Sequence, residues 1–168
     1  MIQTERLILR SYRDHDQEDM IRLLTNETIK ETFMIPEFNS KEEAIQMFQK
    51  LQAWSKSKDH YEVGIYLDEK LIGFLNDVMM EQDKIELGFV IHPDYHNHGY
   101  ATEALLAAIN DLFEKGFQEV IAGAFVENKA SIHVLEKCKM QRINKEEDIF
   151  YHKELKHCVY YSICKDKI

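Results

Sequence analysis

One segment of the sequence, residues 84–126, constrains the fold more than any other part of the chain. It holds an alternating apolar run (Lys84–Ile91), a loop, an amphipathic helix pattern (Tyr100–Lys115) and a second apolar run (Gln118–Val126). A strand, a helix and a strand in this order predict a right-handed crossover between two parallel strands. In such units ligands bind at the carboxyl ends of the strands, beside the N-terminus of the connecting helix. We therefore expect a ligand site at the loop before the helix.

The rest of the chain predicts antiparallel strands and further helices. The capping-box pattern Ser40-Lys-Glu-Glu43 marks the start of one helix. The other predicted elements are a strand over Arg6–Tyr12, a helix over Asp14–Leu24, strands over Tyr61–Leu67 and Leu71–Met80, a helix over Asn128–Lys139, and strands around Ile149–Tyr151 and Val159–Cys164. The predicted fold class is α/β (α+β), a mixed and mostly antiparallel sheet flanked by helices.

The composition is typical of one soluble domain. The chain has 168 residues, and no Gly/Ser linker divides it, so we expect a single domain over residues 1–168. A net charge of −9 argues against nucleic-acid binding, which needs a basic face. Three cysteines, an odd number, argue against a disulfide framework. Because residues 1–10 do not resemble a signal peptide and no apolar run approaches ~20 residues, we expect a cytoplasmic protein with no membrane partner. The final strands can pair across a dimer, so we expect a monomer or a homodimer.

The loop His96–Ala101 has the features of an anion site. The first amides of a helix lack an internal acceptor, and the helix dipole adds partial positive charge there. Gly99 permits close approach of the backbone to a bulky anion, and Asn97 tolerates a left-handed turn. A pyrophosphate is the natural occupant, and an ordinary connection between a strand and a helix is the alternative.

Three segments in order resemble the GNAT acetyltransferase superfamily. The segment His92–Ala104 looks like the acyl-CoA-binding motif, Q/R-x-x-G-x-G/A, which falls on His96–Ala101. The segment Asn128–Cys138 looks like the second motif, N-x-x-S-x-x-v-l-e-K. The opening Thr4–Arg10 is similar to the start of the ribosomal-protein N-terminal acetyltransferase (Rim-type) branch. His96 and Asn97 replace the usual Gln or Arg and Gly, but the backbone amides of the loop survive these departures.

The resemblance implies a GNAT-like fold whose parallel strand pair splays at the cofactor site, with acetyl-CoA as co-substrate. In this family the strand before the loop contacts the pantetheine arm, and the loop contacts the pyrophosphate. The residues that the resemblance assigns to cofactor binding are Phe89, Val90, Ile91, His96, Asn97, His98, Gly99, Tyr100, Ala101, Thr102, Asn128 and Ser131. Ser131 would lie near the thioester sulfur. Leu135 occupies the place where many members carry a tyrosine acid, which favours a role for Ser131 in catalysis.

Glu86 is the predicted base. It shares a strand face with Gly88 and Val90, so it lies either at a solvated edge or in a cleft. By resemblance, it matches the glutamate base of the ribosomal-protein N-terminal acetyltransferase branch. An amine attacks only when neutral, and its pKa is ~7.7–8.0 for an α-amine but ~10.4 for a lysine-like amine. A thiol has a pKa of ~8.5, so the thiolate can leave near neutral pH without a strong acid to protonate it. Ser131 therefore need only donate a hydrogen bond to the sulfur.

The predicted function is N-acetyl transfer from acetyl-CoA to a primary amine. Attack would be direct, within a ternary complex, because no residue looks like an acyl-carrying nucleophile and Cys138 falls on a core face. The acceptor that the resemblance favours is a protein N-terminal α-amine. The alternatives are a small amine (a polyamine, an amino acid or a drug) and a non-catalytic acyl-CoA-binding domain. His92, His96 and His98 lack a Cys or carboxylate at a familiar zinc spacing, so we expect no metal.

Overall fold

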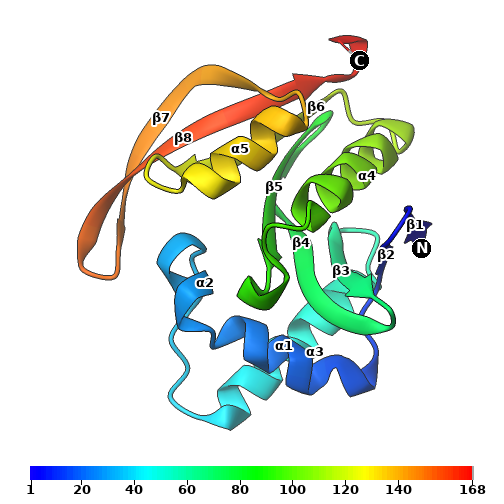
Figure 1. Cartoon of the computed structure of the whole chain (residues 1–168), viewed down its shortest axis with the longest axis vertical. Helices are drawn as coiled ribbons and strands as arrows, with labels where there is room; N and C mark the ends of the chain where they lie inside the picture. The colour runs from blue at the N-terminus through cyan, green and yellow to red at the C-terminus, as the bar shows by residue number, and fades with distance from the viewer. Residues whose placement is uncertain (168) are drawn as a thin grey trace. The chain divides into compact units, whose positions relative to one another are not determined.

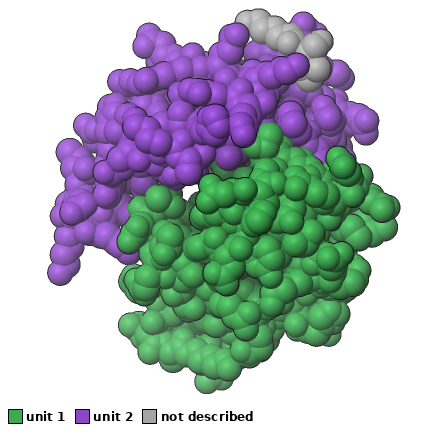
Figure 2. Space-filling view, in the orientation of Figure 1, with its two compact units in different colours: residues 1–76, 89–104 green, residues 77–88, 105–168 purple. Residues whose placement is uncertain are grey.

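The structure, a computed structural model, describes residues 1–167 of the chain (Figure 1). The described residues form two compact units, one of residues 1–76 and 89–104 and the other of residues 77–88 and 105–167 (Figure 2). Within the described residues the strands form one eight-stranded sheet in the order β1-β2-β3-β4-β5-β6-β8-β7. The strands β4 (Lys70–Glu81) and β5 (Lys84–Ile91) each belong partly to both units. The expectation of one domain stays a prediction.

The first unit begins with short antiparallel strands and three helices. Its strands are β1 (Ile2–Gln3), β2 (Ile8–Arg10), β3 (Glu62–Leu67) and the start of β4, and its helices are α1 (Gln17–Leu24), α2 (Glu27–Thr32) and α3 (Lys41–Ser55). A cluster of buried side chains joins these helices to the sheet, and its members include Tyr12, Met20, Leu23, Phe48, Tyr66, Phe74 and Val90. Apolar side chains at helical spacing on α1 and α3 supply this face.

The predicted first helical region was incomplete. A short 3₁₀ turn, η1 (Asp14–Asp16), precedes α1, and the helix α2 was missed because it has only six residues. Asn26 caps α2 by accepting the Ile29 amide at 3.0 Å. The Ser40 hydroxyl accepts the Glu43 amide as expected, whereas the Glu43 carboxylate reaches back to the amide of Asn39, at 2.7 Å.

The second unit contains the parallel strand pair. The ladder of β5 with β6 (Glu119–Phe125) runs from the pair Lys84–Glu119 to the pair Leu87–Ala122, and each strand continues beyond it. The predicted fold class, a mixed and mostly antiparallel sheet with one parallel strand pair and flanking helices, is confirmed. The core of the second unit contains buried side chains from β5, α4 and β6. They are Ile85, Leu87, Leu105, Ala108, Leu112, Val120 and Ala122, all almost fully buried.

The connecting helix α4 (Tyr100–Glu114) ends as expected at Gly116, whose φ of +105° favours glycine. A second helix, α5 (Lys129–Lys137), follows β6, and Asn128 caps it. A shorter 3₁₀ turn, η3 (Lys165–Lys167), closes the described chain. Within residues 1–167, no helix combines the length and the apolar character that crossing a bilayer requires.

The last two strands are much longer than predicted. They are β7 (Gln141–Tyr151) and β8 (Glu154–Cys164), joined by a tight turn at His152 and Lys153 with φ of +49° and +62°. β7 was only partly predicted because its first half is almost entirely polar, without the alternation that marks a half-buried strand. β7 is the last strand in the sheet order, so many of its side chains face solvent and its sequence stays polar.

Candidate active site

The loop between β5 and α4 lies in the first unit and has the backbone geometry of an anion site. A short 3₁₀ turn, η2 (Pro93–Tyr95), follows β5. Asn97 and Gly99 then adopt left-handed conformations, with φ of +65° and +80°. The Gly99 carbonyl accepts the Glu103 amide at 3.0 Å, so Gly99 directly precedes α4 and accepts its first helical hydrogen bond. The amides of Tyr100 and Ala101 therefore lie in the first turn, where a helix offers them no internal acceptor. The arrangement suits a bulky anion such as a pyrophosphate.

The three histidines near this loop have different roles. A ring nitrogen of His96, Nε2, lies 2.7 Å from the Ile91 carbonyl oxygen, so His96 ties the loop to the end of β5. His92 Nδ1 accepts the Asp94 amide at 3.1 Å. The His98 ring stacks on Tyr100, with centroids 5.5 Å apart. Among the described residues, no group of three His, Cys, Asp or Glu side chains is placed to hold a metal ion.

The end of β5, which the resemblance assigns to the pantetheine arm, departs from simple alternation. Val90 and Ile91 are both buried, whereas Phe89 is only partly so. β4 approaches this segment closely at Gly73, where an added Cβ would lie 2.1 Å from the Val90 carbonyl oxygen. The His92 amide donates to the Ile72 carbonyl at 2.8 Å. The position of the strand end therefore depends on a residue without a side chain at position 73.

Glu86 lies in the second unit, on the paired part of β5, opposite Ile121 of β6. Because β5 lies inside the sheet order, Glu86 is not at a sheet edge, and its side chain is partly buried. Burial raises the pKa of Glu86, the Lys145 ammonium opposes this, and the Glu147 carboxylate adds to it. A carboxylate whose pKa is raised accepts a proton more readily, as a general base must.

Polar side chains of β7 and β8 make up the surroundings of Glu86. The Tyr160 hydroxyl donates a hydrogen bond to the Glu147 carboxylate, and Lys145 Nζ lies 4.3 Å from the centre of the Tyr160 ring. Sequence reasoning missed Lys145 and Glu147, since both lie in the polar half of β7 that carried no strand signal. These groups place one ammonium and a second carboxylate within electrostatic reach of Glu86.

Asn128 and Ser131 form a closed pair at the start of α5. The Asn128 side-chain oxygen accepts the Ser131 amide at 3.2 Å, and its Nδ2 donates to Ser131 Oγ at 2.9 Å. Because Ser131 Oγ accepts in this bond, its own hydrogen can be donated elsewhere. The Asn128 amide retains one further N–H for the pantetheine contact that the resemblance implies.

Two further positions of the second motif agree with expectation. Cys138 is fully buried, and burial raises the pKa of its thiol to about 12, so it is not a nucleophile. Leu135 is also fully buried, and its side chain packs in the core.

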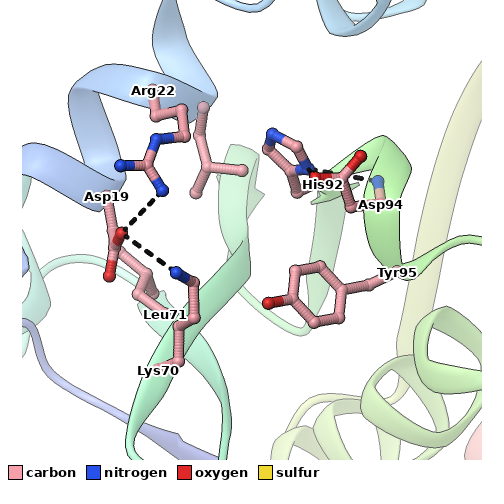
Figure 3. Close-up of a pocket in the computed structure, with 8 residues that line it drawn as sticks. Asp19, Arg22, Lys70, Leu71, His92, Asp94 and Tyr95 are labelled. Atoms are coloured by element: carbon pink, nitrogen blue, oxygen red, sulfur yellow. Dashed lines mark hydrogen bonds and ion pairs between the residues drawn. The ribbon is translucent and has the colours of Figure 1, made fainter.

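Figure 3 shows a polar pocket of the first unit, between α1, β4 and η2. Asp19 Oδ1 lies 3.4 Å from Arg22 Nη1 and 3.8 Å from Lys70 Nζ. His92, Asp94 and Tyr95 line the opposite side. Its charged side chains pair largely with one another, so we assign no reaction to it.

Sequence comparison decides the family. The Acetyltransferase (GNAT) domain model matches residues 6–141 of the chain. The chain belongs to the GNAT acetyltransferase family. One relative, the uncharacterized N-acetyltransferase YoaA of Bacillus subtilis (strain 168), is 28% identical over 147 residues, which cover 84% of this chain and 83% of YoaA.

Solved structures share the fold. A putative ribosomal-protein-serine acetyltransferase from Vibrio cholerae has a TM-score of 0.79 at 24% identity, covering 97% of this chain and 96% of the other. Spermidine N-acetyltransferase from Vibrio cholerae, solved with CoA and spermine, has a TM-score of 0.83 at 18% identity and covers 98% of each chain. Both structures share the fold of this chain at only 24% and 18% identity.

Proposed function

We propose that this GNAT protein transfers an acetyl group from acetyl-CoA to a primary amine. The observation that carries the proposal is the loop before α4, where Asn97 and Gly99 hold left-handed conformations and the helix starts at Tyr100, directly after Gly99. The residues of the loop fit acetyl-CoA, because their backbone amides can bind its pyrophosphate without the Gln or Arg side chain that His96 replaces. When bound, acetyl-CoA supplies the acetyl group as a reactive thioester.

Each side chain then has a role in the proposed reaction. Phe89, Val90 and Ile91 border the pantetheine arm, and the loop His96–Thr102 binds the pyrophosphate. Glu86 takes a proton from the acceptor amine, for which its raised pKa suits it. Ser131 donates a hydrogen bond to the sulfur, and Asn128 orients the Ser131 hydroxyl.

Replacing Ser131 with Ala is expected to lower kcat about 10-fold, the size of one hydrogen bond to a developing charge. The effect should be modest because a thiolate is a good leaving group at neutral pH. Steady-state kinetics at saturating acetyl-CoA would measure it. Ser131→Thr keeps the hydroxyl and should recover most of the rate. An alanine variant as fast as the unaltered protein would remove Ser131 from the reaction.

The acidic surroundings of Glu86 favour an acceptor that carries positive charge. Two carboxylates, Glu86 and Glu147, and a net charge of −9 favour a cationic amine. We propose a protein N-terminal α-amine, whose pKa of ~7.7–8.0 a single carboxylate base can serve near neutral pH. The Vibrio cholerae relatives support both a ribosomal-protein acceptor and a polyamine, so spermidine is the second candidate.

Thermal unfolding with acetyl-CoA tests the cofactor part of the proposal. A ligand that binds only the folded state adds about 2.7 kcal/mol at one hundred times its Kd. We expect a saturable rise in Tm with acetyl-CoA, and a much smaller one with ATP, which lacks the pantetheine arm. No rise up to millimolar acetyl-CoA would contradict the proposal.

Thiol release with a panel of amines tests the acceptor. Peptides that vary in their first two residues, spermidine, free amino acids and an amine drug would be compared at equal concentration. Turnover that depends on the first two peptide residues supports the α-amine acceptor, whereas preference for spermidine supports the small-amine alternative. Binding of acetyl-CoA without turnover of any amine would support a non-catalytic acyl-CoA-binding domain.

A further inference from the structure

The N-terminal segment makes direct contact with the phosphate loop, although the two are far apart in sequence. Thr4 Oγ1 and the Arg6 amide both donate to Oε1 of Glu103, at 2.6 and 2.8 Å. Arg6 Nε donates to Oε2 of the same carboxylate at 2.7 Å. Glu103 lies in the first turn of α4, so three hydrogen bonds join the N-terminal segment to the start of this helix.

Arg6 also contacts the loop itself. Its Nη1 donates to the His98 carbonyl at 2.8 Å, and its Cζ lies 4.6 Å above the Tyr100 ring. In a trans peptide the C=O and the following N–H point in opposite directions. The bond from Arg6 therefore fixes the plane of the peptide between His98 and Gly99 and directs the Gly99 N–H away from Arg6.

The segment that carries Arg6 is itself firmly held. Leu7 and Leu9, which follow Arg6, have almost fully buried side chains, and β2, which begins at Ile8, pairs with β3. Thr4 also closes a local turn, because its hydroxyl accepts the Leu7 amide at 2.9 Å. Because the backbone around Arg6 is fixed in this way, the Arg6 guanidinium can hold the loop before α4 in one conformation.

Arg6 also compensates the charge of Glu103. Burial acts to raise the pKa of Glu103, but hydrogen bonds from Thr4 and Arg6 outweigh it, so the pKa is lowered and the carboxylate stays ionised. An ionised carboxylate in the first turn of α4 would repel a pyrophosphate there unless a cation neutralised it. Arg6 is that cation.

From these contacts we propose that Thr4, Arg6 and Glu103 form a brace that pre-orders the loop for acetyl-CoA. Arg6 and Glu103 are positioning residues in this proposal: they act through the backbone of the loop. The inference rests on the proposed function, which supplies the ligand. Linkage then requires the converse effect, that bound acetyl-CoA stabilises the N-terminal segment.

Calorimetric titration with CoA tests the brace. Arg6→Gln is expected to weaken CoA binding about 10-fold to 100-fold, because it removes charge-assisted hydrogen bonds and leaves Glu103 uncompensated. Arg6→Lys should not restore binding, since an ammonium cannot bond Glu103 and the His98 carbonyl in the same fork geometry. The double variant Arg6→Gln/Glu103→Gln should bind CoA more tightly than Arg6→Gln alone. Arg142→Gln removes an arginine–glutamate pair on β7 and is the matched control, expected to bind as the unaltered protein does.

Kinetics and hydrogen exchange separate a positioning role from a merely structural one. The KM for acetyl-CoA should rise in Arg6→Gln, while kcat at saturating acetyl-CoA stays within about 3-fold, because the reacting groups are untouched. In the unaltered protein, CoA should slow amide exchange of residues 4–10, a measurement that needs no substitution. Thr4→Val offers a milder variant if Arg6→Gln fails to fold.

Two results would overturn the brace. One is CoA binding by Arg6→Gln within 2-fold of the unaltered protein. The other is unchanged exchange of residues 4–10 when CoA saturates the unaltered protein. If the unaltered protein itself binds no CoA, the proposed function fails, and this outcome is distinct from both.

Discussion

Glu86→Gln is expected to lower kcat for acetyl transfer at least about 100-fold, within the range that a general base contributes. The substitution keeps the size of the side chain and removes only its ability to accept the acceptor's proton. Stopped or continuous thiol-release assays at saturating acetyl-CoA and amine would measure the loss. Binding of acetyl-CoA should persist, because the cofactor contacts that we propose lie elsewhere.

The stability of the Glu86 variant provides the first control. Since the pKa of Glu86 is raised in the folded protein, its contribution to stability is present below the unfolded pKa and is lost as pH rises through the folded pKa. Above the folded pKa the ionised side chain therefore adds no stability, and Glu86→Gln should not lower the Tm there. Glu119→Gln, on the neighbouring strand and paired with Lys84 at 3.4 Å, is the matched control and should keep kcat.

The pH dependence follows from the same shift. The unaltered protein should lose activity as pH falls through the raised pKa of Glu86, because protonation removes the base. The glutamine variant should lack this dependence. If Glu86→Gln keeps full activity, Glu86 is not the base, and another group accepts the proton.

Gly73→Ala is expected to have the second large effect, on both stability and cofactor binding. Its Cβ would lie 2.1 Å from the Val90 carbonyl oxygen and 3.1 Å from Ile91 Cα, so backbone must move. Crowding of this kind costs about 1–3 kcal/mol of unfolding free energy. Because the displaced backbone borders the proposed pantetheine site, we expect at least about 10-fold weaker acetyl-CoA binding as well. Urea denaturation and calorimetric titration would measure the two effects.

Gly64→Ala is the matched comparison on the neighbouring strand. Its Cβ would lie 2.7 Å from Tyr66 Cε2 and 2.8 Å from Leu71 Cδ1, so it crowds side chains and not the backbone of β5. Both alanine variants should lose stability, but only Gly73→Ala should lose affinity beyond what its lower stability explains. If both variants bind acetyl-CoA with equal affinity under conditions where both are folded, the end of β5 is not part of the cofactor site.

Local patterns in the sequence predicted the central part of the fold well. The alternation in Lys84–Ile91 and the helical spacing after Gly99 predicted β5 and α4 closely. Gly116 and Asn128 marked helix ends through conformations and bonds that few residue types supply. The motif spacing that resembled the GNAT superfamily agrees with the family that residues 6–141 match.

Features that depend on distant contacts escaped prediction. The first half of β7 is polar, and only its pairing with β8 makes it a strand. Glu147 pairs with Cys158 of β8, Lys145 lies in the irregular stretch of β7 between Arg142 and Glu146, and both interact electrostatically with Glu86. Gly73 looked like any glycine in a strand, and its importance comes from the carbonyl of Val90 beside it.

By itself, the sequence determined the order of elements, the phosphate-type loop and the residues expected around the cofactor. The order of elements and the loop follow from periodicity, capping residues and glycine, which act over a few neighbouring positions. The residues expected around the cofactor follow from the resemblance to the GNAT superfamily. Only the tertiary structure decided which groups set the pKa of Glu86 and which groups hold the loop. Arg6 and Glu103 are 97 residues apart, and the hydrogen bond between them exists because folding brings the two segments together. Such bonds leave no periodic trace in a sequence, since their geometry is created by the packing of the whole fold.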